Sequence, residues 1–491
     1  MSAVSISRML VKRCVVAAMV FLMLSAFELP AQTTLNNHIA SILADSSLSR
    51  AQVGVSIRNI QTKSIVFEKN GNQSFTPASN LKLLTTAAAM HILGADYRFV
   101  TKVLYSDSVQ NGSFSGILLI KGSGDPTLGS DNMYGQLSYQ ALIKKWVTAL
   151  KTKGVTVFNG KLVIDPTHFE YNAIPMDYTW GDIGNYYGAG SYGLNINENQ
   201  CAILFKPGTK VGSKTSVQSI TPWDTTCTFV NHVYTGLANI GDEAFVYSSP
   251  YSNSVFAEGK IPLGSPFTVK GSISNPSELL GQLIIAEMKL QGIVWNGSFV
   301  VTQPGESIAG LSGFKILIEH TSLPLREIAT YTNLVSNNLY AECLLKELAF
   351  KKTGQGVTAI GVNQVKRYLK SIGVDTIGMV LRDGSGMSPF NSIAPNQYTQ
   401  FLTTQHANTA FVKCLPIAGK EGTVAHICKE SGGKIRVKSG TMNGTTCYSG
   451  YVLAKSGKTY AVSLLVNKHE AKNRKIQRVL EKVLLEILTN G

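Results

Sequence analysis

A serine and a lysine stand three residues apart at Ser79 and Lys82, where an apolar stretch that extends to Met90 begins. In a helix, residues at positions i and i+3 lie on the same face, so this spacing predicts a hydroxyl next to an amine. A part-buried lysine without its proton can take the serine proton and make the serine a nucleophile. We therefore expect an acyl-transfer site at this pair.

The Ser-x-x-Lys pattern occurs three times, beginning at Ser79, Ser312 and Ser431. The second and third matches contain glycine, which is typical of turns. Only Ser79 follows a Pro-Ala pair and opens an apolar helix. The alternative for Ser79 is an ordinary helix N-cap, with the lysine in solvent one turn later.

Acyl-transfer sites of this kind need a Ser-x-Asn element, whose hydroxyl relays a proton and whose amide holds the substrate. The pattern occurs at Ser130–Asn132, in a glycine-rich loop, and at Ser336–Asn338, between two helical stretches. A rigid helical mounting suits a catalytic hydroxyl better, so we favour Ser336. Its alternative is a helix-capping serine.

The third element is a Lys-Thr/Ser-Gly run on a strand, which recognises a carboxylate and completes an oxyanion hole. Of its three matches, Lys352 ends a helix and Lys455 lies between two strands, as expected for a cap and a hairpin turn. Lys438 closes the alternating run 434–437 and is followed by hydroxyl residues. We favour Lys438; its alternative is a turn.

Seven blocks of sequence occur in an order that is typical of a single family. They are residues 77–82, 124–128, 336–342, 383–388, 415–419, 422–423 and 438–441, the last followed by 449–451. In these blocks the chain resembles the D-alanyl-D-alanine carboxypeptidase/endopeptidase group of class C low-molecular-mass penicillin-binding proteins. The resemblance covers nearly the whole chain after the first 31 residues.

The resemblance implies the roles of the catalytic residues. Ser79 is the nucleophile that becomes acylated, and Lys82 is its general base. Ser336 relays the proton to the leaving D-alanine, and Asn338 holds the substrate amide. The reaction implied is hydrolysis of D-Ala-D-Ala in peptidoglycan stem peptides, of their cross-links, or of both, with β-lactams as covalent inhibitors. No metal or other cofactor is implied.

The resemblance also implies the residues that bind substrate. Lys438 supplies positive charge, while the hydroxyls of Ser439 and Thr441 bind the terminal carboxylate. Ser439 stands where the family more often has threonine, and Pro389 where some members have an arginine that meets the stem-peptide side chain. Asp182 lies in the region that lines that side-chain pocket and could bind an ammonium; its alternative is a solvated loop aspartate.

The implied fold is α+β: a penicillin-recognising, serine β-lactamase-like antiparallel sheet sandwiched by helices, with a large strand-rich insert. We expect a secretory signal at 1–31, a peptidase core formed by 32–95 and 302–491, and the insert at 96–301. The signal has basic Arg8, Lys12 and Arg13 before the short apolar run 14–27. It predicts an exported protein of the periplasm or cell envelope.

Composition narrows the remaining choices. The net charge of +15 suits an anionic cell-wall polymer or a membrane surface, although a solvated basic surface is the simpler interpretation. Nucleic-acid binding is not expected, because no aromatic-basic repeat is present. Six cysteines follow the signal without any C-x-x-C pair; Cys201–Cys227 and Cys414–Cys428 form local disulfides or remain buried thiols.

Two other functions remain open. A β-lactamase or esterase on the same scaffold would need fast deacylation, which the sequence does not identify. A non-catalytic peptidoglycan-binding protein would not need Ser79, Lys82, Ser336 and Lys438 together. The oligomeric state is not indicated by the sequence.

Overall fold

The computed structural model describes residues 33–303, 306 and 313–491, and these form two compact units. Unit 1 contains the described residues before Pro77 together with Ile393–Asn408 and Leu415–Gly491. Unit 2 contains Pro77–Ser392 and Thr409–Cys414. The predicted signal and the Ser312 match lie outside the described residues.

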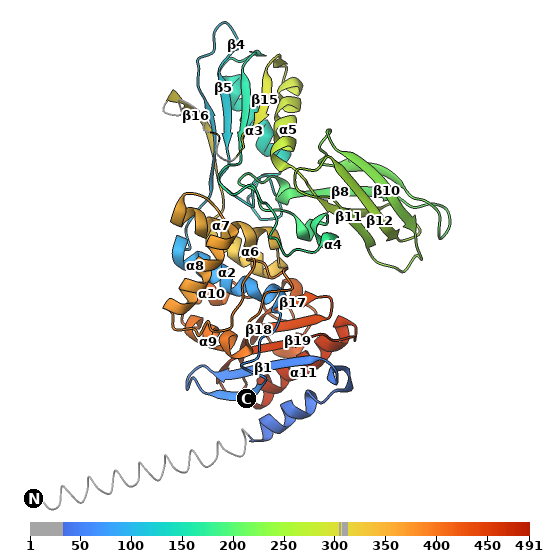
Figure 1. Cartoon of the computed structure of the whole chain (residues 1–491), viewed down its shortest axis with the longest axis vertical. Helices are drawn as coiled ribbons and strands as arrows, with labels where there is room; N and C mark the ends of the chain where they lie inside the picture. The colour runs from blue at the N-terminus through green and yellow to red at the C-terminus, as the bar shows by residue number, and fades with distance from the viewer. Residues whose placement is uncertain (1–32, 304–305, 307–312) are drawn as a thin grey trace, which may run out of the picture. The chain divides into compact units, whose positions relative to one another are not determined.

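Unit 1 is built on a five-stranded antiparallel sheet in the order β17-β18-β19-β1-β2. Its strands are β1 (Gln52–Asn59), β2 (Ile65–Lys69), β17 (Ile435–Met442), β18 (Thr445–Leu453) and β19 (Thr459–Asn467). β1 pairs with β19, so the beginning and the end of the chain share one sheet, as the blue and red strands of Figure 1 show.

Helices cover this sheet on both faces. The helix α11 (Asn473–Asn490) buries one apolar side, which includes Ile476, Val479 and Val483, in a cluster with alternate residues of the strands. The helix α9 (Pro395–Gln405) lies on the other face, where Ser56 and Thr399 hydroxyls are 2.8 Å apart. A further helix spans residues 33–42 and contributes Leu35 and Ile39 to the α11 cluster.

Unit 2 contains a group of packed helices that carry Lys82 and Asn338 and adjoin Ser79 and Ser336. They are α2 (Lys82–Leu93), α6 (Leu325–Val335), α7 (Asn338–Thr353), α8 (Thr358–Ser371) and the short α10 (Thr409–Lys413). α7 contacts α2, α6 and α8, and nearly all its residues from Leu339 to Ala349 are buried. The central position of α7 fixes the residues at its N-terminus.

The rest of unit 2 is rich in strands. A five-stranded sheet, β15-β7-β5-β3-β16, combines β3 (Val100–Tyr105), β5 (Ile117–Lys121), β7 (Lys161–Asp165), β15 (Ser298–Val301) and β16 (Lys315–Thr321). Beside it are three three-stranded sheets. They contain β4 (Ser113–Phe114), β6 (Val157–Phe158) and β14 (Val294–Trp295); β8 (Gln200–Lys206), β9 (Ser216–Thr221) and β13 (Phe267–Ser272); and β10 (Thr228–Thr235), β11 (Glu243–Tyr247) and β12 (Ser254–Ile261).

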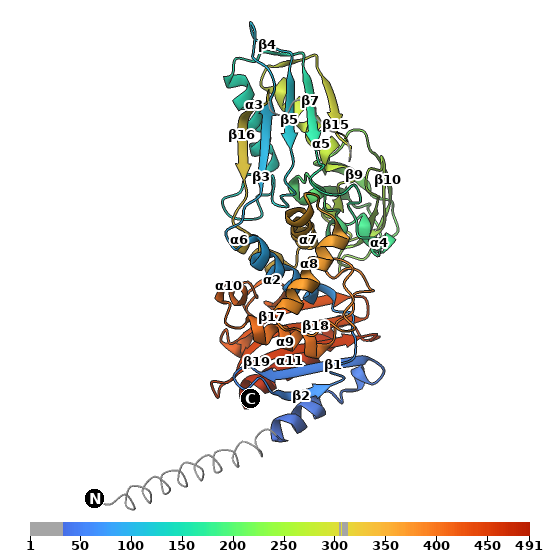
Figure 2. The same ribbon diagram turned by 60° about the vertical axis from the view of Figure 1, so that its left-hand side comes forward.

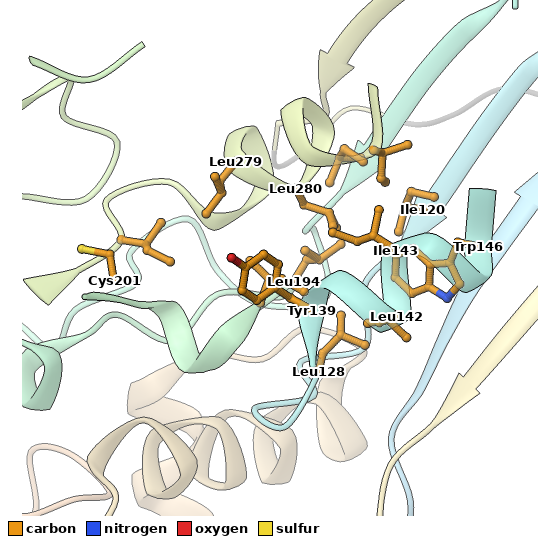
Figure 3. Close-up of a cluster of buried hydrophobic side chains, with 14 of the residues drawn as sticks. Ile120, Leu128, Tyr139, Leu142, Ile143, Trp146, Leu194, Cys201, Leu279 and Leu280 are labelled. Carbon is orange, nitrogen blue, oxygen red and sulfur yellow. The ribbon is translucent and has the colours of Figure 1, made fainter. Parts of the chain in front are cut away.

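Two helices, α3 (Tyr139–Thr152) and α5 (Pro276–Leu290), lie along the larger sheet in both views. Figure 3 shows side chains of α3, α5 and β5 that converge in one apolar cluster, with Trp146 and Leu142 on the α3 side. Apolar residues at i, i+3 and i+4 on α3 explain this one-sided burial.

The α+β fold with an antiparallel sheet between helices is confirmed. The two helical stretches predicted on either side of Ser336–Asn338 are α6 and α7. The strands β9 to β12, the strand β16 and the helix α9 were not predicted. The α9 sequence is largely polar and contains Thr and Asn, which are weak helix formers, so only packing against the sheet reveals it.

The boundaries of the core and insert stay predictions. The six cysteines of the described chain are all unpaired, five of them buried, so the buried-thiol alternative holds there.

The aromatic stack around Phe158 generates a test of the unit 2 core. The ring of Phe158 is fully buried, lies 4.9 Å from Trp295 and 5.3 Å from Phe114, and fills space that no neighbour can reach. We expect Phe158→Ala to lower the free energy of unfolding by about 3–5 kcal/mol, since it leaves a cavity. Calorimetry checks this, with the fully exposed Tyr134→Ala as the control that leaves the transition unchanged. Equal transitions for the two variants would contradict it.

Candidate active site

Ser79 lies in a 3-10 turn, Ala78–Leu81, directly before α2, so the regular helix begins at Lys82 rather than at Ser79. Side chains at i and i+3 of a 3-10 turn lie nearly above one another, which brings Ser79 and Lys82 together. Neither the turn nor α2 has a side-chain cap, so Ser79 does not act as the N-cap of the alternative interpretation. Ala78 has a left-handed backbone with φ 46°, a strained conformation for a residue with a Cβ.

The Lys82 amine is completely buried and makes three short contacts. Its Nζ lies 2.8 Å from Ser79 Oγ, 2.6 Å from Asn338 Oδ1 and 2.7 Å from the carbonyl oxygen of Ser385. The last two oxygens can only accept a hydrogen bond, whereas the serine hydroxyl can also donate one. A neutral amine has two N–H groups and one lone pair, so once its N–H groups donate to these two oxygens the lone pair is left to accept the Ser79 proton.

The electrostatics favour this neutral form. Burial lowers the pKa of Lys82 to about 7, and the carboxylates of Asp383 and Glu342 oppose that shift without cancelling it. A substantial fraction of Lys82 is therefore uncharged at neutral pH. The pair has the contact and the protonation state that a serine nucleophile with a lysine base requires.

Asn338 is the first residue of α7, and its amide orientation follows from its contacts. Nδ2 donates to the carbonyl oxygen of Tyr187 at 2.8 Å, which leaves Oδ1 for Lys82. Ser336 ends α6 in a left-handed conformation with φ 61°, so the chain turns sharply between the two helices at this residue. Ser336 and Asn338 thus occupy the predicted helical junction.

The loop 383–388 supplies the Ser385 carbonyl and packs against the 3-10 turn that contains Ser79. Gly386 has φ +86°, and a Cβ there would overlap the carbonyl oxygen of Ala78, so only glycine fits. The buried Glu342 carboxylate accepts the N–H groups of Gly384 and Ser385 at 2.8–3.0 Å. The Glu342 side chain on α7 therefore holds this loop in place.

A second buried acid holds the other half of the same loop. Asp383 accepts the N–H groups of Gly386 at 2.9 Å and Ser388 at 2.6 Å. Burial, followed by the nearby charge of Glu342, raises the pKa of Asp383 to about 7. These carboxylates provide the negative potential that keeps the Lys82 pKa from falling further.

Residues 178–187 border the cluster from the strand-rich part of unit 2. The Tyr178 hydroxyl lies 2.8 Å from Ser385 Oγ and 3.0 Å from Glu342 Oε1. Asp182 is half-buried on the short helix α4 (Trp180–Ile183) and accepts from Thr179 Oγ1 at 2.7 Å. Because Tyr187 contacts Asn338, the predicted side-chain pocket region is adjacent to the Lys82 cluster.

The roles of Glu342, Tyr178 and the Ser385 carbonyl were not predicted. The 383–388 and 336–342 blocks were recognised in the sequence, but their spacing to Ser79 carries no information on contacts. Only the fold brings α7, the loop and the Ser79 turn to one point.

Lys438, Ser439 and Thr441 lie on β17, the edge strand of the unit 1 sheet. The Lys438 side chain is buried and its Nζ donates to the carbonyl oxygen of Ser439 at 2.6 Å. Cross-strand pairing places Lys438 in one row with Ser449, Ser463 and Ser56. Ser439 Oγ lies 2.7 Å from Thr423 Oγ1, so the 422–423 block contacts the Lys-Ser-Gly run within unit 1.

Metal-binding groups and membrane-spanning helices were considered for the described residues. Within 33–303, 306 and 313–491, no group of three His, Cys, Asp or Glu side chains is arranged to hold a metal ion. Over those same ranges, none of the helices combines the length and the apolar character needed to cross a membrane.

Comparison with known proteins adds relatives of similar length. The chain is 28% identical over 457 residues to a D-alanyl-D-alanine carboxypeptidase of Actinomadura sp. (strain R39), which covers 89% of this chain and 81% of that protein. It is 23% identical over 457 residues to the D-alanyl-D-alanine carboxypeptidase DacB of Haemophilus influenzae, with 91% of each chain covered.

Solved structures share the fold. The crystal structure of penicillin binding protein 4 (dacB) from Haemophilus influenzae matches with a TM-score of 0.78 and 22% identity, over 92% of this chain and 99% of that one. The same protein has been solved in complex with a β-lactam, and that structure matches with a TM-score of 0.73 and 21% identity over 91% and 97% of the two chains.

A family model described as the D-Ala-D-Ala carboxypeptidase 3 (S13) family matches residues 35–486. The predicted resemblance is confirmed, and with it the predicted class of enzyme, a serine-type D-Ala-D-Ala peptidase. The chain belongs to the D-Ala-D-Ala carboxypeptidase 3 (S13) family.

Proposed function

We propose that this chain hydrolyses peptidoglycan stem peptides that end in D-Ala-D-Ala through an acyl-enzyme on Ser79. The observation that carries the proposal is the Lys82 amine, which is buried, has a pKa of about 7 and lies 2.8 Å from the serine hydroxyl. A serine at its ordinary pKa is a weak nucleophile, and an adjacent base is the usual remedy.

The chemical steps follow from this arrangement. Lys82 takes the Ser79 proton as Oγ attacks the carbonyl carbon of the penultimate D-alanine. The tetrahedral oxyanion accepts hydrogen bonds from the backbone N–H groups of Ser79 and Thr441. Ser336 relays the proton to the departing D-alanine nitrogen, which leaves the acyl group on Ser79. Water then attacks the ester carbon and gives one proton to the Lys82 amine; as the bond to Ser79 Oγ breaks, Lys82 returns that proton to Oγ and the shortened peptide leaves with a free carboxyl group.

The family resemblance assigns substrate recognition to further residues. Asn338 holds the substrate amide, and Lys438, Ser439 and Thr441 bind the terminal carboxylate. Asp182 binds the ammonium of a diamino acid in the stem peptide. Pro389 has no charge, so it neither attracts nor repels that side chain. The same chemistry cleaves a cross-link when the leaving group is a D-alanine amide of a second stem, so carboxypeptidase and endopeptidase actions share one site.

Location and further partners are part of the proposal. The basic segment followed by the apolar run 14–27 supports export to the periplasm or cell envelope, where this substrate occurs. The net charge of +15 supports peripheral contact with an anionic cell-wall polymer or membrane.

Replacing the nucleophile gives the first test. Ser79→Ala should abolish both the stable adduct with fluorescent penicillin and the release of D-alanine from a D-Ala-D-Ala peptide. Ser431→Ala is the control, since Ser431 begins another Ser-x-x-Lys match and is buried, whereas Ser79 is half-buried; this variant should keep both activities. Rapid penicillin turnover by the parent protein would favour a β-lactamase, and absence of adduct and product would end the catalytic proposal.

The lysine base predicts a pH profile. Protonated Lys82 cannot accept the serine proton, so kcat/KM should rise with pH through a midpoint of about 7 and fall below it. Lys82→Arg stays charged at every accessible pH, and its acylation rate should drop by about 10²–10⁴. Stopped-flow acylation by penicillin across pH measures both effects. A parent profile without this rise, or an active Arg variant, would rule out Lys82 as the base.

Asp182 predicts a change of substrate preference. Asp182→Asn removes a half-buried negative charge, so KM should rise by about tenfold for a stem peptide with a free side-chain ammonium, the value of roughly one charge-assisted hydrogen bond. Peptides with an uncharged residue at that position, and penicillin itself, should react as before. Steady-state kinetics with the paired peptides decides; an equal loss on both would show that Asp182 does not recognise the charge.

A further inference from the structure

Glu198 is a buried carboxylate, 4% exposed, that receives hydrogen bonds only from neutral groups. Its Oε1 accepts from Ser130 Oγ at 2.7 Å, Asn132 Nδ2 at 2.8 Å and the Tyr340 hydroxyl at 2.9 Å. Its Oε2 accepts from Asn337 Nδ2 at 3.1 Å and, at the longer distance of 3.5 Å, from Gln200 Nε2. No lysine, arginine or histidine of the described chain forms an ion pair with it. A charge buried in this way needs all its hydrogen bonds, so the network is strongly constrained.

The backbone under Glu198 is unusual as well. Asn197, Glu198 and Asn199 have φ of 52°, 54° and 52°, three successive left-handed residues that are not glycine. Such conformations persist only where the surrounding structure imposes them, and they gather at functional sites. The Asn199 side chain imposes this one, because its Oδ1 accepts from the Ile196 N–H at 3.0 Å and its Nδ2 donates to the Gly190 carbonyl at 2.8 Å.

Asn337 connects this carboxylate to the Ser-x-Asn element. While its Nδ2 donates to Glu198, its Oδ1 accepts the N–H of Tyr340 at 3.1 Å and caps α7. Both ends of the amide are committed, so Asn337 has one orientation. Ser336 and Asn338 flank it in the chain, and Asn338 contacts Lys82 at 2.6 Å.

The Ser130–Asn132 sequence, set aside above as a second Ser-x-Asn match, acquires a role here. The side chains of Ser130 and Asn132 both donate to Glu198, and neither contacts Lys82. The glycine-rich loop thus holds Glu198, which in turn contacts Asn337 in the Ser336–Asn338 element.

We propose that Glu198 is a positioning residue that acts through Asn337 to hold Ser336 and Asn338 in their catalytic geometry. It fixes the middle residue of the Ser-x-Asn element, while the outer two face the reaction. The inference rests on the proposed acyl-enzyme function. A displacement of about 1 Å at Ser336 or Asn338 lowers the rate of reaction far more than it lowers substrate binding.

An exchange of amide and carboxylate tests the proposal. Asn337→Asp keeps the oxygen that caps α7 but places a second carboxylate against Glu198. Glu198→Gln turns an N–H toward the Asn337 amide, so a hydrogen bond is lost. Each single variant should lower kcat on a D-Ala-D-Ala peptide by about 10–100-fold, with KM within about twofold. The double variant restores one donor and one acceptor, and its kcat should return to within about tenfold of the parent.

A matched control separates positioning from general stability. Asp224 is also buried and accepts only from neutral groups, namely Thr226 N–H and Oγ1 and Gln282 Nε2, at 2.7–2.9 Å. Asp224→Asn should lower Tm without changing kcat. Single variants at 198 and 337 that match the parent in kcat, or a double variant that recovers Tm without recovering kcat, would overturn the inference. A parent protein that forms no penicillin adduct would instead overturn the proposed function.

Discussion

The site depends on one lysine being kept without its proton. A lysine in water is almost entirely charged at neutral pH, and a charged lysine cannot act as a base. Lys82 reaches a pKa of about 7 because its amine is withdrawn completely from solvent. Burial without partners would be too costly, so each N–H must meet an acceptor. Asn338 and the Ser385 carbonyl meet this demand, and the remaining lone pair is left for Ser79.

Several contacts within unit 2 enclose the Lys82 amine. The 383–388 loop reaches the amine only because Gly386 allows it to touch the Ala78 carbonyl. Glu342 and Asp383 bind the loop through its N–H groups, and their charges limit how far the Lys82 pKa falls. The same two carboxylates therefore shape the loop and set the protonation of the base.

Residue types and spacing were enough to predict the pair Ser79–Lys82, because i and i+3 contacts are local. Ser336 and Lys438 required a choice among several matches, which strand and helix context supplied. Contacts between distant segments could not be predicted: nothing in the spacing joins Glu342 to Gly384, or Glu198 to Asn337. The same limit applied to the fold: α6, which buries one apolar face, was predicted before Ser336, whereas α9, in which seven of eleven residues are Thr, Gln or Asn, was not predicted.

The wide separation of the Lys82 partners along the chain has a consequence for when the enzyme becomes active. Asn338 and Ser385 lie 256 and 303 residues beyond Lys82. A nascent chain that contains Ser79 but has not reached residue 338 has neither acceptor, so its lysine stays hydrated and charged. Contacts of such long range form late, after the segments between them have folded. Ser79 thus lacks an uncharged amine beside it during synthesis, and the pair takes its final form only with the completed fold.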